Sequence, residues 1–427
     1  MNEVYQQANP WWYKIPPEPA WIQRTRFLKP ILDHWDHPQI QILIGSRRVG
    51  KTTLLKQVLF HLLTQSKIPG QQVCYLSLDH PKLHGTPLSQ HVQNFRQLFR
   101  HPREQKLWLF LDEVQESPQW QAELKSLYDA ENVKIFCSGS TATLIERHQG
   151  KLTGRQICHT INLLSFSEFL SFRKQQDVPP SEPYRMVALC EDYLQTGGYP
   201  DQVLQPSDLY LANLLEDILA RDIERIFKPR KPYLLKDLLK LLATSVTNRL
   251  SFNKMAHTLG VTSDTIKDYI HYFQSAFLLG SLDKFSGNIN DRIYSGKKIY
   301  FADTGIKLML SALDFGALAE NACFNWLHFQ NVECGYYAEL QKEVDFVCRR
   351  QQQLLPVESK YMSHVDFSEE RWQGLKLFFK RKPEVKTAVI VTKDVSQTFE
   401  WEGKSIVAVP LWKFLSEPLP ALLSESL

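Results

Sequence analysis

The strongest chemical signal in the sequence is a glycine-rich segment that ends in lysine and threonine. GSRRVGKTT, residues 45–53, matches the pattern GxxxxGK(S/T) and stands between the apolar run 40–44 and the helix-forming run 52–63. In that setting the glycines let several backbone N–H groups point at phosphates, and the helix adds its dipole. Lys51 would reach the β- and γ-phosphates, and the Thr52 hydroxyl would ligate Mg²⁺. The sequence predicts a site for ATP and Mg²⁺ formed by Gly45, Ser46, Arg47, Arg48, Val49, Gly50, Lys51, Thr52 and Thr53.

Two carboxylates stand where a second apolar run ends. KLWLFLDE, residues 106–113, closes on Asp112 and Glu113. Asp112 would hold Mg²⁺ through water, and Glu113 would polarise the water that attacks ATP. A plain turn at the end of a strand is the alternative, but two neighbouring carboxylates on a buried strand are costly without a cation. The pair therefore indicates hydrolysis of ATP as well as binding.

Other polar residues are weaker candidates for catalysis. VKIFCSGS places Ser138 and Ser140 at the end of a further strand, where a hydroxyl can contact the γ-phosphate or the water, although turn capping explains them equally well. Arg155 in KLTGR can stabilise transition-state charge as an arginine finger, in the same or a neighbouring subunit, or form a surface salt bridge. The candidate catalytic residues are Lys51, Glu113, Ser140 and Arg155.

A second constellation lies near the C-terminus. EVDFVCRRQQQLLPVESKY, residues 343–361, predicts two short strands around a polar turn at 349–353. Glu358 and Lys360 share one face of the second strand, and Asp345 lies on the first. Two carboxylates can hold a divalent cation, and a lysine beside them can activate a water for phosphodiester attack. A solvated hairpin with one salt bridge is the alternative.

Length and composition set the class of protein. With 427 residues the chain is expected to form two to four domains, and its net charge of +4 does not by itself argue for nucleic acid. Seven cysteines without a CxxC pair indicate reduced thiols. No signal-peptide core and no long apolar run are found, so we expect a soluble, cytoplasmic protein without a membrane partner.

The chain divides into five segments. Residues 1–37 are aromatic and proline-rich. In residues 38–163 four apolar strand candidates alternate with helical or polar segments, which is typical of a parallel sheet covered by helices. Residues 164–230 are mostly helical, residues 231–298 hold three short helices, and residues 299–427 return to mixed strands and helices. The sequence thus predicts an α/β protein.

The three short helices, with a tight turn between them, resemble a helix-turn-helix. Ser251 and either Thr262 or Ser263 are the expected N-caps, and Gly260 is expected to end the middle helix. The aromatic stripe of the last helix is expected in the core. Non-specific contact with DNA phosphates stays open for four cations, Lys267, Arg292, Lys297 and Lys298.

The order of motifs resembles that of the prokaryotic AAA-type P-loop ATPases that carry a C-terminal domain related to PD-(D/E)xK nucleases. The motifs are GSRRVGKTT, FLDEVQ, CSGSTATLI, LTGR, LSFSEFL, TGGYPD, DILARDIE, VTSDTIKDYI, KIYFADTG, EVDFV and VESKY, and they span about residues 22–410. The resemblance implies a P-loop ATPase core at 38–163, a helical lid at 164–230, a winged-helix-like segment at 231–298 and a restriction-endonuclease-like α/β domain at 299–427.

The resemblance also assigns roles to individual residues. It places nucleotide binding on the P-loop, metal and water roles on Asp112 and Glu113, and, loosely, a sensor role on the region of Ser140. The nuclease-like pattern would use a helical acid, Glu320 in LAENACF. The other members of this candidate nuclease site are Asp345, Glu358 and Lys360. The usual Pro-Asp pair of the pattern is Val344-Asp345 here.

Two classes of function compete for this sequence. In the first, which we prefer, ATP binding and hydrolysis drive a conformational or assembly switch, and the C-terminal domain binds nucleic acid or another partner. In the second, ATP regulates a metal-dependent DNA nuclease. A signalling or defence ATPase with a protein partner is a third interpretation. An arginine finger supplied by a neighbour would require a homo-oligomer.

Overall fold

The computed structural model describes residues 2–140, 152–179, 181–350 and 353–418. The chain forms two compact units, Met1–Asn162 and Leu163–Leu427, which we call the N-terminal unit and the C-terminal unit. Within the described residues no helix has the length and apolar character needed to cross a membrane.

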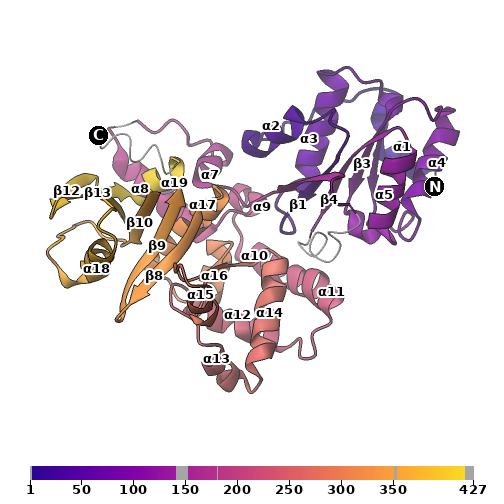
Figure 1. Cartoon of the computed structure of the whole chain (residues 1–427). Helices are drawn as coiled ribbons and strands as arrows, with labels where there is room; N and C mark the ends of the chain where they lie inside the picture. The colour runs from indigo at the N-terminus through magenta and orange to yellow at the C-terminus, as the bar shows by residue number, and fades with distance from the viewer. Residues whose placement is uncertain (1, 141–151, 180, 351–352, 419–427) are drawn as a thin grey trace. The chain divides into compact units, whose positions relative to one another are not determined.

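The core of the N-terminal unit is a five-stranded sheet whose strands all run parallel (Figure 1). Its order is β2-β3-β4-β1-β5. The bounds are β1 Ile40–Ile44, β2 Val73–Ser77, β3 Leu107–Asp112, β4 Val133–Gly139 and β5 Gln156–Thr160. Strands β1 to β4 are apolar and buried along almost their whole length, as expected for strands covered on both faces. The predicted parallel sheet is confirmed.

Helices connect and cover these strands. They are α1 Asn2–Ala8, η1 Pro10–Trp12, α2 Thr25–Asp33, α3 Lys51–Thr64, η2 Gly70–Gln72, α4 Leu88–Phe99, η3 Val114–Glu116 and α5 Trp120–Ala130. Helix α3 packs against β1, β3 and β4 and buries Leu54, Leu55 and Val58 completely. This burial fixes α3, and with it the loop that precedes it, relative to the strand ends.

The free edge of β2 is covered by residues that follow α1. The Asn9 side chain donates to the Tyr75 carbonyl at 2.9 Å and accepts from the Tyr75 N–H at 2.6 Å. The indole N–H groups of Trp11 and Trp12 both donate to the Val73 carbonyl, at 3.1 and 2.7 Å. These side chains satisfy backbone groups that an edge strand otherwise leaves open.

The C-terminal unit contains a six-stranded mixed sheet of order β12-β13-β11-β10-β9-β8, orange to yellow in Figure 1. The bounds are β8 Glu333–Glu339, β9 Lys342–Arg350, β10 Gln353–Ser359, β11 Thr387–Thr392, β12 Gln397–Trp401 and β13 Lys404–Pro410. The pairs β10/β11 and β11/β13 are parallel, and the others are antiparallel. The two strands predicted around the turn at 349–353 are β9 and β10, while residues 351–352 of that turn lie outside the described residues.

A smaller antiparallel sheet pairs β6 Leu279–Leu282 with β7 Lys298–Phe301. The helices of this unit are α7 Phe166–Phe172, α8 Pro183–Thr196, α9 Pro200–Leu204, α10 Asp208–Asp217, the π-helical η4 Ile218–Glu224, α11 Arg225–Phe227, α12 Leu234–Thr244, α13 Phe252–Leu259, α14 Ser263–Ser275, α15 Ile289–Tyr294, α16 Thr304–Leu310, α17 Phe315–Phe329, η5 Glu370–Trp372, α18 Gln373–Arg381 and α19 Leu411–Ser416. Helix α17 packs against both β10 and β7, so it joins the two sheets.

The three predicted short helices are α12, α13 and α14. Ser251 and Thr262 cap α13 and α14 by accepting hydrogen bonds from backbone N–H groups three residues later, and Gly260, with φ of 61°, ends α13. These expectations for the helix ends are confirmed. The β6/β7 sheet follows the three helices along the chain, with α15 between its strands.

Candidate functional site

The glycine-rich segment forms the connection between β1 and α3. Gly45 has φ of 154°, and a Cβ on it would lie 2.3 Å from the Ile161 carbonyl oxygen, so no larger residue fits without a backbone shift. Gly50 has φ of 98° and directly precedes the first helical residue, Lys51. The loop conformation therefore depends on glycine at two positions, and it places the N-terminus of a 14-residue helix at the end of the sheet.

The Lys51 ammonium lies over its own loop. Lys51 is buried, and its Nζ donates to the carbonyl oxygens of Gly45 and Ser46 at 3.0 and 2.9 Å. A cation held there, beside the helix N-terminus, is where an anionic phosphate chain would be attracted.

Asp112, at the end of β3, accepts hydrogen bonds from three elements. Its Oδ2 accepts from the Thr52 hydroxyl of α3 at 2.8 Å and from the Tyr75 hydroxyl of β2 at 3.0 Å, and its Oδ1 accepts from the Ser138 hydroxyl of β4. Burial, together with the Asp112 carboxylate, raises the pKa of Tyr75, which therefore stays a hydroxyl donor. Hydroxyl and carboxylate oxygens are the ligands that Mg²⁺ prefers, and Thr52 and Asp112 already touch, so the residues fit this ion.

Glu113 is held beside this carboxylate by a second network. Its backbone is in the left-handed region with φ of 52°, and its N–H donates to the Ser138 hydroxyl at 3.0 Å. The Gln115 amide donates both to the Glu113 carboxylate and to the Ser140 hydroxyl, the latter at 3.2 Å. The predicted residues Glu113 and Ser140 are thus brought together through Gln115, whose role the sequence did not indicate.

Arg155 forms the surface ion pair that was the alternative to an arginine finger. Its guanidinium donates to both carboxylate oxygens of Asp129, at 2.9 and 3.3 Å. Arg155 directly precedes β5, and Asp129 lies in α5. Both side chains are partly exposed. The role of an arginine finger stays a prediction.

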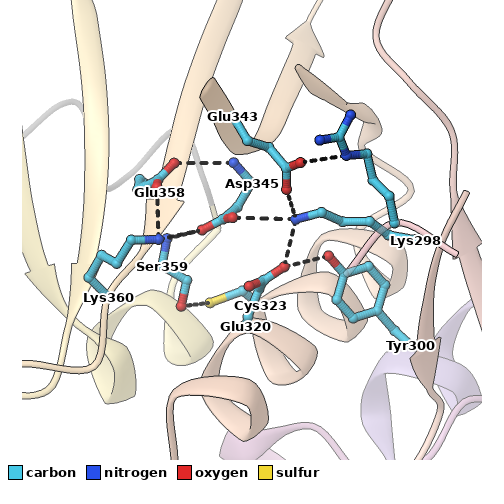
Figure 2. Close-up of polar contacts among 10 residues, drawn as sticks. Lys298, Tyr300, Glu320, Cys323, Glu343, Asp345, Glu358, Ser359 and Lys360 are labelled. Atoms are coloured by element: carbon cyan, nitrogen blue, oxygen red, sulfur yellow. Dashed lines mark hydrogen bonds and ion pairs between the residues drawn. The ribbon is translucent and has the colours of Figure 1, made fainter. Parts of the chain in front are cut away.

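The second constellation is buried at the junction of the two sheets in the C-terminal unit (Figure 2). Asp345 on β9 and Glu358 on β10 are 6% and 4% exposed, so the alternative of a solvated hairpin is wrong. The Asp345 N–H donates to Glu358 at 3.2 Å, and the Ser359 N–H donates to Asp345 at 3.0 Å. Lys360, one residue beyond β10, contacts Glu358 at 2.8 Å and Asp345 at 3.3 Å. The fold therefore brings these predicted residues together.

A second lysine, Lys298 of β7, enters the same cluster from the opposite side (Figure 2). Its Nζ lies 3.1 Å from Glu320 of α17, 2.5 Å from Glu343 and 3.4 Å from Asp345, both of β9. Lys298 is 1% exposed. The Tyr300 hydroxyl donates to the same Glu320 oxygen at 2.7 Å. Contact of Lys298 with DNA phosphates, which the sequence left open, is excluded in this structure because its ammonium is buried among carboxylates.

Burial and charge act in opposite directions on these groups. Burial alone would lower the pKa of Lys298, but Asp345, Glu320 and Glu343 outweigh it and raise this pKa, so the ammonium stays charged. Burial, followed by repulsion from Asp345, raises the pKa of Glu358 and of Glu320. Burial alone would raise the pKa of Asp345, whereas Lys360 and Lys298 bring it below its usual value. Asp345 is therefore the carboxylate on which both lysines converge.

The sequence analysis did not assign Glu343 or Lys298 to this cluster, although weak signals for both were present. Glu343 stands two residues before Asp345, and Lys298 two before Tyr300, so each pair shares one face of its strand. Nothing in the sequence indicated that the two strands meet. Over the described part of the chain, no three His, Cys, Asp or Glu side chains are placed so that they could hold a metal ion.

Comparisons with known proteins match separate parts of the chain. Residues 37–170 match a family described as an AAA domain. Residues 187–316 and 315–414 match two families described as domains of unknown function, DUF8612 and DUF4143. The residues that match the AAA domain include the whole five-stranded sheet, the glycine-rich loop at 45–53 and the carboxylates Asp112 and Glu113.

Two similar proteins are described only as uncharacterized. One from Haemophilus influenzae is 25% identical over 352 residues, which cover 79% of this chain and 86% of that protein. One from Methanocaldococcus jannaschii is 28% identical over 320 residues, covering 68% of this chain and 66% of that protein.

Two solved structures are among those similar to this chain. They are the RuvB Holliday junction branch migration motor of Thermotoga maritima (TM-score 0.29, 17% identity, covering 60% of this chain and 86% of that one) and AMPPCP-bound DnaA of Aquifex aeolicus (TM-score 0.28, 17% identity, covering 60% and 89%). At these scores the similarities support no conclusion about the substrates or partners of this chain.

Proposed function

We propose that this chain, which carries an AAA-type P-loop domain at residues 37–170, binds ATP with Mg²⁺ and hydrolyses it. The observation that carries the proposal is the contact between the Thr52 hydroxyl and Asp112 directly beside the P-loop. A hydroxyl at the start of α3 and a carboxylate at the end of β3 are sixty residues apart in sequence, yet they meet at one edge of the sheet. That edge is where parallel α/β folds bind their ligands.

Each residue of the site has a task in this proposal. The loop N–H groups and Lys51 would bind the β- and γ-phosphates, and Thr52 and Asp112 would hold the metal ion. Magnesium, when bound, would offset charge on the phosphate oxygens. Glu113 would orient the attacking water and accept its proton, while Gln115 and Ser140 keep that carboxylate in position. Tyr75 and Ser138 fix the orientation of Asp112.

ATP turnover would serve a conformational or assembly switch, with the C-terminal unit as a recognition module. In the structure the Lys51 ammonium rests on two loop carbonyls, contacts that compete with binding to a phosphate. Nucleotide would therefore change the hydrogen bonds around the loop. The three short helices α12, α13 and α14, followed by the β6/β7 sheet, support a winged-helix-like module that binds nucleic acid or protein.

The other two interpretations of the sequence receive less support. In a metal-dependent DNA nuclease Asp345 and Glu358 would bind a metal ion, but here their carboxylates are paired with the ammonium groups of Lys298 and Lys360. The Asp112 carboxylate, by contrast, accepts hydrogen bonds from neutral hydroxyls. A signalling or defence ATPase with a protein partner shares the same ATP chemistry and differs only in what the C-terminal unit binds.

The test compares wild-type protein with Lys51→Ala and Glu113→Gln. We expect wild type to bind and hydrolyse ATP, Lys51→Ala to lose tight binding, and Glu113→Gln to bind ATP but turn it over at least about a hundredfold more slowly. Turnover that Lys51→Ala leaves unchanged would refute the assignment of the site. Native mass spectrometry with and without ATP would show whether nucleotide changes the oligomeric state, as an assembly switch requires.

A further inference from the structure

We propose that the Lys298 ammonium occupies the position of a divalent cation among Glu320, Glu343 and Asp345, so that the nuclease-like carboxylate centre of the C-terminal unit is closed by an internal cation and takes no metal. The carboxylates and the lysine all belong to the C-terminal unit, and their arrangement does not depend on whether the N-terminal unit hydrolyses ATP.

Oxygens of three carboxylates surround the Lys298 ammonium. Its Nζ is approached by oxygens of three carboxylates, at 2.5, 3.1 and 3.4 Å, from two elements that are distant in sequence, α17 and β9. Three carboxylates repel one another in a buried place unless a cation lies between them. Here the cation is part of the chain.

A metal ion and the Lys298 ammonium cannot both occupy the space between the oxygens of Glu320, Glu343 and Asp345. A divalent ion bound to the same oxygens would lie about 2.0–2.6 Å from each of them. The Lys298 Nζ is already 2.5 Å from Glu343 and 3.1 Å from Glu320, so the volume between these oxygens is filled. Lys298 would have to leave before a metal ion entered.

Asp345 and Glu358 have both of their carboxylate oxygens engaged within the chain. Asp345 Oδ1 faces Lys298, and its Oδ2 accepts from the Ser359 N–H and contacts Lys360. Glu358 Oε1 contacts Lys360, and its Oε2 accepts from the Asp345 N–H. Both residues that the nuclease pattern assigns to metal binding are thus engaged by both of their oxygens.

Lys298 is also held in place from outside the cluster. Its backbone pairs with Leu282 in the β6/β7 sheet and forms a bridge with Arg249. The Arg249 guanidinium contacts the second oxygen of Glu343 at 3.2 Å. The lysine therefore ties the segment that carries the three short helices to the six-stranded sheet, and it enters from a strand rather than from a loose loop.

The decisive experiment is a Mn²⁺ titration of the full chain without nucleotide, followed by electron paramagnetic resonance of free Mn²⁺. Every variant in the titration carries Asp112→Asn, which removes the carboxylate proposed to hold Mg²⁺ in the N-terminal unit. With Lys298 present we expect no bound Mn²⁺ at millimolar concentration. Binding that is abolished by adding Asp345→Asn would overturn the proposal.

Lys298→Met removes the ammonium from among the three carboxylates and keeps a long, unbranched side chain. This variant is expected to bind one Mn²⁺ per chain, and to unfold at a lower temperature in EDTA than in Mn²⁺. The matched control, Lys298→Arg, keeps the charge and should bind none. A folded Lys298→Met protein that binds no Mn²⁺ would show that the ammonium does not stand in for a metal.

If Lys298→Met cannot be purified, the titration of the chain that retains Lys298, with and without Asp345→Asn, still decides the question. ATP turnover, measured on chains that keep Asp112, reports separately on the proposed function. Loss of one inference would therefore leave the other testable.

Discussion

Tyr75 provides a test of how the N-terminal unit holds its metal-binding carboxylate. Its hydroxyl donates to the same Asp112 oxygen that accepts from Thr52. Tyr75→Phe removes this hydroxyl and keeps the ring, over which the Lys56 ammonium lies 5.4 Å from the centroid. The substitution therefore changes one contact of Asp112 and little of the packing.

The expected effect follows from the energy of one hydrogen bond to a charged group. Such a bond contributes about 1.5–3 kcal/mol. Asp112 keeps its bonds from Thr52 and Ser138, so we take the lower end, about 1.5 kcal/mol. Because about 1.4 kcal/mol corresponds to a factor of ten, Tyr75→Phe should lower kcat/KM for Mg·ATP roughly tenfold.

The assay is steady-state ATP hydrolysis at a series of Mg²⁺ concentrations with ATP held constant. We expect Tyr75→Phe to need more Mg²⁺ for half-maximal turnover, because the Asp112 carboxylate is less well oriented. Tyr13→Phe is a matched control, since Tyr13 is 72% exposed. Circular dichroism would verify that both variants are folded.

Equal turnover by Tyr75→Phe and wild type at every Mg²⁺ concentration would refute the reasoning. It would mean that Asp112 needs no support from β2, or that it does not act on the metal. A fall in turnover that more Mg²⁺ cannot restore, with unchanged half-saturation, would instead place Tyr75 in the chemical step.

Three further predictions concern stability. Asn9→Ala leaves the Tyr75 N–H and C=O without these partners and should destabilise the N-terminal unit by about 2–4 kcal/mol in urea unfolding; an unchanged midpoint would contradict the role of Asn9. Burial lowers the pKa of His91 to about 4, below the value of about 6.5 in the unfolded chain, so the unfolded state takes up the proton first as pH falls. His91 alone should therefore lower stability by about 1.6 kcal/mol between pH 6.5 and 5, and His91→Gln should reduce this slope in urea titrations at each pH. Gly374→Ala would place a Cβ 1.9 Å from the Glu343 carbonyl oxygen and should cost about 3 kcal/mol, seen as a lower thermal midpoint of the C-terminal unit.

The sequence was sufficient to predict those parts of the fold and of the site that a local pattern of residues determines. The P-loop pattern needs only the eight consecutive residues 45–52, and the apolar runs that became β1 to β4 could be recognised one at a time. The N-caps Ser251 and Thr262 were predictable for the same reason, because a cap acts within three residues of itself.

The sequence was insufficient to predict contacts between elements that are distant along the chain. Lys298 stands in a segment rich in cations and polar residues, and that composition is equally typical of an exposed DNA-binding surface. Its burial depends on α17 packing against both β7 and β10, which no local pattern encodes. Tyr75 likewise reaches Asp112 only because β2 lies beside β3 in the sheet order.

The side chains that cover β2 have a consequence for how copies of this protein can meet. Because Asn9, Trp11 and Trp12 occupy the outer backbone groups of that strand, two molecules cannot join their sheets edge to edge there. A truncated chain that begins after Trp12 would expose an apolar strand with open N–H and C=O groups, and we expect it to aggregate during expression. Asn9, Trp11 and Trp12 thus protect the edge of the five-stranded sheet from pairing with another chain.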